Sequence, residues 1–251
     1  MNSTETQFAP ADIAAQPARD NGDTGQQRTP PRNFDRAELA FLVGVPLLWA
    51  LLLLFHPGGD ATQMYASVRD ELTPWLAVHL GMLLFIPLMA AAVYVLLRGV
   101  TGTAARVSRI ALAPFVVFYS AFETLQGIGN GVLAHEVNGL PESQRATGSE
   151  LVQEFGENVL IRDLGVFSSL GGLAFIVAAI AAGIALHRHA GAPVSVAVLL
   201  ALAGFLITAH PPPFGPTGLA LFILAVLIVA RGQGGTGSSS SDTRASPGGL
   251  S

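Results

Sequence analysis

The chain has 251 residues, of which 51% are hydrophobic and 12% are charged, and its formal net charge is −4. The charged fraction is about half that of a soluble globular domain, and the modest negative charge gives no reason to expect a nucleic-acid partner. The chain contains no cysteine, which excludes disulfides, thiolate metal sites and cysteine nucleophiles.

The two ends of the chain are polar. Residues 1–36 contain scattered proline, glutamine and asparagine, and they are predicted to form a disordered cytoplasmic tail. This stretch lacks the apolar core of a secretory signal peptide, so we expect no cleavable signal. Residues 232–251 are rich in glycine and serine and are predicted to form a second flexible cytoplasmic tail.

Six apolar runs lie between these tails. Runs of about eighteen or more apolar residues are typical of membrane spans, so 37–231 is predicted to be an all-α, polytopic transmembrane helix bundle. The last two runs are short and separated by prolines, which leaves a re-entrant hairpin as an alternative to two full spans. The predicted spans are 37–55, 74–97, 110–133, 162–186, 193–209 and 214–230.

The distribution of arginine predicts the orientation of the bundle. Arginines occur before the first run, after the second, after the fourth and after the sixth, whereas the other loops carry mainly acidic residues. By the positive-inside rule this alternation places both termini in the cytoplasm and the chain in the inner (plasma) membrane. All 13 basic residues are arginine, which is typical of a GC-rich bacterial coding sequence. The arginines that define the inner side are Arg28, Arg32, Arg36, Arg98, Arg106, Arg109, Arg188 and Arg231.

The third run contains an intramembrane carboxyl group. Glu123 lies about fourteen residues, or about 21 Å, beyond Arg109, in the outer half of the membrane. An ionised carboxylate facing lipid is costly, so its face of the helix is predicted to line a polar cavity. The alternative is a hydrogen-bonded strip that joins helices, with Gly127, Gly129 and Gly131 allowing close approach. Helical spacing puts on this one stripe Tyr119, Glu123, Gln126 and Asn130.

A charged stretch precedes the fourth run. Thr147 and Glu150 have the spacing of a capping box, which predicts that a helix starts there and runs inward. Arg162 and Asp163 then fall near the outer interface. We expect Arg162 to be the counter-charge of Glu123, and Asp163 to be a partner of His79; the alternative for Arg162 is snorkelling to the lipid headgroups.

Four histidines are predicted to lie near the outer surface. His79 is about five residues inside the second run, and three others end different runs, two of them directly before a proline. As metal ligands they are weak candidates, because no helix carries two histidines at the i, i+4 spacing that places two ligands on one face. The alternative is interfacial histidines with no ligand. No cofactor motif is present, and the cofactor, if any, is unknown. The four candidates are His56, His79, His135 and His210.

Three functional hypotheses follow from these patterns. The favoured one is a binding, sensory or accessory protein whose polar cavity opens to the outer face. The second is an outer-leaflet membrane enzyme, metal-dependent or not, that uses Glu123 and His79; the lack of a triad-like array weighs against an enzyme. The third is a small secondary transporter, which the nearly apolar inner halves of the runs disfavour. The expected partners are the lipid bilayer and either a helix of another protein or a second copy.

Overall fold

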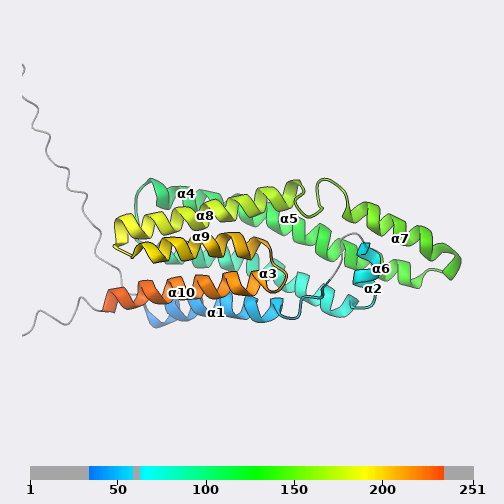
Figure 1. The fold of residues 1–251 in the computed structure, drawn as a ribbon, viewed down its shortest axis with the longest axis horizontal. Helices are drawn as coiled ribbons and strands as arrows, with labels where there is room; N and C mark the ends of the chain where they lie inside the picture. The colour runs from blue at the N-terminus through cyan, green and yellow to red at the C-terminus, as the bar shows by residue number, and fades with distance from the viewer. Residues whose placement is uncertain (1–33, 59–62, 235–251) are drawn as a thin grey trace, which may run out of the picture.

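The structure is a computed structural model that describes residues 34–58 and 63–234, and every regular element in these ranges is a helix (Figure 1). The prediction of an all-α chain is therefore confirmed for the described part. The predicted tails, apart from a few residues at their inner edges, lie outside the described residues. The helices are α1 Arg36–Leu53, α2 Met64–Arg69, α3 Leu72–Leu96, α4 Thr103–Pro114, α5 Ser120–Phe122, α6 Asn130–Gly139, α7 Glu142–Gly156, α8 Val166–Ala190, α9 Val194–Thr208 and α10 Phe214–Gly234.

Five helical stretches are long and apolar enough to cross a membrane. They are α1, α3, the continuous rod Thr103–Gly139, α8 and the Phe214–Gly232 part of α10. Helices of this length and composition are those of a membrane protein. The fifth predicted run forms α9, which is apolar but has only 15 residues.

The bundle has two chemically different ends (Figure 1). The start of α1, the end of α10 and the α3–α4 and α8–α9 connections lie together, and we call this the arginine end. Arg36 begins α1, Arg98 follows α3, and Arg231 is in the last turn of α10. At the opposite end, which we call the histidine end, His56 follows α1 and His210 follows α9.

The rod Thr103–Gly139 extends past the rest of the bundle at the histidine end (Figure 1). Its 37 residues measure about 55 Å, whereas the hydrocarbon layer is only about 30 Å thick. The last part of the rod, α6, packs there with α2 and α7 around a small apolar core of its own. That core consists of Met64, Val68, Trp75, Ala134, Val137 and Val152.

Small residues bring the helices of the main core close together. Ala178, Ala182 and Ala185 on α8 are buried, and Gly183 lies against the backbone of Ala197 on α9. Small side chains let helix backbones approach closely, which is the usual means of association within membranes. The α8–α9 pair is therefore closely packed and positions the segments at its histidine end.

The rod contains two π-helical segments, Phe115–Tyr119 and Glu123–Gly129. Pro114 directly precedes the first and lacks the N–H group that a regular helix would use there. The second contains Gly127 and Gly129, whose backbones bend at little steric cost. Widened turns of this kind are uncommon and occur frequently at functional sites, and here one of them starts at Glu123.

Two sequence-based predictions about the fourth run are wrong. The predicted helix start at Thr147 lies inside α7, which begins at Glu142 after the extended residue Pro141. The fourth long helix starts at Val166 and not at residue 162, because Leu164 has a left-handed backbone conformation, with φ 57°, which a regular right-handed helix does not contain. Residues 157–165 therefore connect two separate helices.

Candidate metal centre

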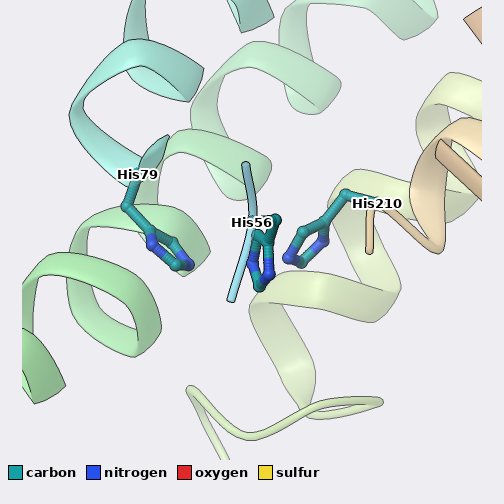
Figure 2. Close-up of side chains that lie close together, drawn as sticks. All are labelled: His56, His79 and His210. Atoms are coloured by element: carbon teal, nitrogen blue, oxygen red, sulfur yellow. The ribbon is translucent and has the colours of Figure 1, made fainter. Parts of the chain in front are cut away.

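Three histidines from three separate segments meet at the histidine end (Figure 2). His56 follows α1, His79 is on α3, and His210 follows α9. Each offers one ring nitrogen, and these three nitrogens all lie within 4.8 Å of one another. The rings approach one another in Figure 2, and the centroid of the His56 ring is 5.1 Å from each of the other two.

Hydrogen bonds to backbone carbonyl oxygens orient two of these rings. The Nδ1 of His79 is 2.7 Å from the Trp75 carbonyl oxygen, and the Nδ1 of His56 is 2.8 Å from the Pro57 carbonyl oxygen. A carbonyl can only accept, so Nδ1 carries the proton in each ring and Nε2 keeps its lone pair. Metal-ligating histidines are usually oriented in this way, by donating their other N–H to an oxygen.

Tyr119 holds the third ring. Its hydroxyl donates to the Thr208 carbonyl oxygen at 2.9 Å, and the hydroxyl oxygen is 3.3 Å from the Nδ1 of His210. Because its proton points to Thr208, the hydroxyl can accept from His210, which again leaves Nε2 with a lone pair. Gly215 on α10 fixes the backbone on the other side, since a Cβ at that position would overlap the His210 carbonyl.

Glu123 completes the cluster. Its side chain is 1% exposed, with Oε2 3.9 Å from His79 Nε2 and Oε1 3.7 Å from His210 Nδ1. These distances are too long for hydrogen bonds. Within the described residues, the Oε1 of Glu123 and the Nε2 of His56 are both buried without a hydrogen-bond partner. A buried polar atom left unsatisfied costs about 1–3 kcal/mol, so the cluster lacks a central partner.

A divalent transition metal fits this arrangement. Zn²⁺ binds imidazole nitrogen at about 2.0–2.1 Å, which places the nitrogens on a tetrahedral ion about 3.4 Å apart. The three ring nitrogens, all within 4.8 Å of one another, are close enough to share one ion. Neutral imidazole and carboxylate donors suit Zn²⁺ and its first-row neighbours. A bound cation would give the buried Nε2 of His56 the partner that it lacks.

The centre faces an open cavity of about 960 Å³. His56, His79 and His210 form part of its wall together with Glu123 and, at the exposed rim, Asp163. Burial lowers the pKa of His56, an effect that the hydrogen bond to Pro57 and the charge of Asp163 partly offset. Burial, with smaller contributions from His56 and His79, lowers the pKa of His210 well below its usual range. Both imidazoles are thus neutral near pH 7, which is the form that binds metal.

The predicted polar stripe serves two purposes. Tyr119 and Glu123 face the histidines, whereas Asn130 donates to both the backbone carbonyl and the side-chain oxygen of Gln126, at 2.7 and 3.1 Å. Gln126 also lines the cavity, but Asn130 is fully buried away from it. Gly127 packs against the His79 ring, where any Cβ would overlap it. Asn130 and Gln126 therefore bond to each other within the rod, and the contact with α3 is made at Gly127, whose carbonyl oxygen also accepts a hydrogen bond from the Trp75 indole N–H at 2.7 Å.

Three residues do not lie where their predicted roles require. Arg162 is exposed and, among the residues that the structure describes, makes no ion pair with Glu123. It lies in the α7–α8 connection, because α8 begins four residues after it. Asp163 acts electrostatically on His56 rather than as an ion-pair partner of His79. His135 is exposed on α6, because the rod carries it past the level of the other histidines.

The sequence analysis identified each residue of the centre as a candidate, but it could not predict that the three histidines lie together. His56 and His210 both precede a proline at the histidine end of a helix, and this shared position was the available signal. No helix carries two of the three, so a search for ligand pairs on one helix misses the site.

Comparisons with protein-family models, with curated proteins and with solved structures find no match for this chain. Function is therefore inferred from the geometry of the centre and not from relatives, because a fold class alone does not specify an activity.

Proposed function

We propose that the chain is a metal-dependent membrane hydrolase that holds a divalent transition metal, such as Zn²⁺, on His56, His79 and His210. The observation that carries this proposal is the convergence of three imidazoles with oriented Nδ1 atoms on a buried carboxyl group, with two polar atoms left without partners. Such an array is costly to bury, and an ion at its centre removes the cost.

An enzyme is favoured over a closed structural or sensory metal site. Structural zinc sites use four protein ligands, whereas catalytic sites use three and keep one position for water or substrate. Here the position not taken by histidine faces a cavity of about 960 Å³. This geometry raises the enzyme hypothesis above the binding or accessory protein that the sequence alone favoured, and above a transporter.

Glu123 has the position of the acid–base group. A metal held by His56, His79 and His210 would supply a bound water molecule whose pKa is lowered toward about 7. Glu123 takes a proton from water as the water oxygen bonds to the carbonyl carbon of the substrate. It then gives that proton to the departing oxygen or nitrogen as the bond to the carbonyl carbon breaks. The products are a carboxylic acid and an alcohol or an amine.

We also infer that α9 crosses the membrane, which makes six spans. Both chain ends then lie in the cytoplasm, and the membrane is the inner (plasma) membrane of the cell. The 15 residues of α9 measure about 22 Å, a deficit that local thinning of the bilayer can accommodate. Arginines at the ends of α3, α8 and α10 support this orientation. The centre then opens at the outer face.

Metal analysis of the purified full-length protein tests the proposal. We expect about one equivalent of bound metal in the wild type, and its loss in His56→Ala, His79→Ala and His210→Ala. The matched control is His135→Ala, because that histidine is exposed and lies outside the cluster. A wild-type protein that carries no stoichiometric metal, and takes up none from added Zn²⁺, Co²⁺ or Mn²⁺, would refute the proposal.

A further inference from the structure

The cavity in front of the candidate metal centre has two kinds of wall. Its ionisable groups are the three histidines, Glu123 and, at the rim, Asp163. Much of the remaining lining is apolar and includes Leu54, Leu164, Leu173 and Ile176. A small polar substrate would not need such a surface, because apolar walls contribute affinity only by removing hydrocarbon from water.

The apolar wall follows one face of α8 into the membrane. Ser169, Gly172, Leu173 and Ile176 line the cavity and lie at i, i+3, i+4 and i+7, which is a single helical stripe. The stripe is about 10 Å long, and Ile176 is about 15 Å beyond the first residue of α8. Since α8 is long and apolar enough to span a membrane, this stripe runs from the metal centre toward the hydrocarbon layer.

Exposed apolar side chains surround the mouth of the cavity. Leu54, Leu164 and Leu173 are 59%, 89% and 60% exposed, respectively. Leucine side chains as exposed as these are more stable against hydrocarbon than against water. A mouth bordered by them favours entry of a ligand from the bilayer.

We propose that the substrate is an acyl amphiphile taken from the bilayer, whose ester or amide carbonyl lies at the metal centre and whose hydrocarbon chain lies along the α8 stripe. This inference rests on the proposed hydrolase function and adds the class of substrate. Gly172 has no side chain to narrow the stripe, and the Thr208 side chain of α9 lines the cavity next to it.

Binding of two hydroxamic acids to the Co²⁺-loaded full-length protein tests this inference. Acetohydroxamic acid and lauroylhydroxamic acid share the metal-binding head and differ only in their chain. Metal content is measured first on every sample, and binding is then followed by the visible spectrum of Co²⁺. Each buried methylene improves affinity about fourfold, so burial of only two predicts a preference above tenfold for the long chain.

A pair of α8 variants separates the stripe from simple partitioning into detergent. Leu173→Asn places an amide on the stripe, whereas Leu170→Asn makes the same change at an exposed position of α8 that does not line the cavity. We expect Leu173→Asn to reduce the long-chain preference several-fold and to leave acetohydroxamate binding and metal content unchanged. Leu170→Asn should retain the preference, because partitioning of the ligand into detergent is the same for both variants.

Two results would overturn the inference in distinguishable ways. If metal is bound but the chain-length preference is absent, or is unchanged in Leu173→Asn, the substrate is not held along α8, and the hydrolase proposal stands. If no metal binds to the wild-type protein, the proposed function fails and this inference fails with it.

Discussion

The two ends of the bundle use polar side chains in opposite ways. At the arginine end Arg109 donates to the carbonyl oxygens of Leu97 and Val100, and His187 contacts that of Ala192 at 2.8 Å. At the histidine end, the described atoms of His56 and Glu123 include two that are buried without partners. Among the described residues, Trp49 Nε1 and Asn130 Oδ1 are also buried without partners, but only at the histidine end do two such atoms lie among converging imidazoles, where a ligand could satisfy them.

The largest expected effect is at Glu123, and it tests whether the free atoms are functional. Glu123→Gln keeps the size of the side chain and the three imidazoles but removes the group that accepts a proton. We expect turnover of a chromogenic acyl ester to fall about 100- to 10,000-fold while about one equivalent of metal stays bound. The exposed control Glu136→Gln should keep full turnover. Wild-type turnover in Glu123→Gln would show that this carboxyl is structural.

Metal removal comes next in size. A ligand that binds only the folded protein stabilises it by about 2.7 kcal/mol at one hundred times its Kd. Added Zn²⁺ should therefore raise the melting temperature of the chelator-treated protein. His210→Ala should abolish this rise in melting temperature. His187→Ala should lower the melting temperature itself but retain the rise on adding Zn²⁺, because His187 forms its hydrogen bond within the arginine end. An equal rise in all three proteins would mean that zinc binds elsewhere.

The close packing of the rod against α3 gives a smaller effect. Gly127→Ala places a Cβ inside the His79 ring position, so we expect a loss of about 1–3 kcal/mol in stability together with weaker metal binding. Gly44→Ala adds a Cβ where nothing lies within 4 Å, and it should stabilise α1 by about 0.5–1 kcal/mol. Thermal unfolding in detergent measures both. Unchanged metal affinity in Gly127→Ala would show that the ring adapts.

The finest comparison uses two buried hydroxyl groups. Tyr119 donates to Thr208 beside His210, and Ser108 donates to the Ala178 carbonyl in the main core. Tyr119→Phe and Ser108→Ala should each cost about 1 kcal/mol in stability. Only Tyr119→Phe should raise the Kd for metal, by about tenfold, because it removes the hydroxyl group that orients the His210 ring. Equal metal affinities in the two variants would remove Tyr119 from the centre.

Most of the helices could be predicted from the sequence. The ends of α1, α3, α9 and α10 fall within a few residues of the predicted spans, because long apolar runs have few other solutions in a membrane. The α7–α8 region could not be predicted as well. Its capping-box pattern occurs inside α7, and the left-handed residue Leu164 and the extended residue Pro141 set the helix ends instead. Local signals compete there, and tertiary packing decides between them.

The sequence by itself determined that the chain is a helical membrane protein and that Glu123 has to find polar company, since hydrocarbon solvates neither open backbone nor a carboxyl group. The sequence could not determine which polar residues contact Glu123. Only the tertiary structure places His56, His79 and His210, rather than Arg162, next to this carboxyl group. Three features bring about this arrangement: Gly127 approaches His79 closely, Gly215 packs against His210, and a widened helical turn starts at Glu123. Ligand distances of a few ångströms between three separate segments depend on how helices pack, and spacing along one chain does not encode them.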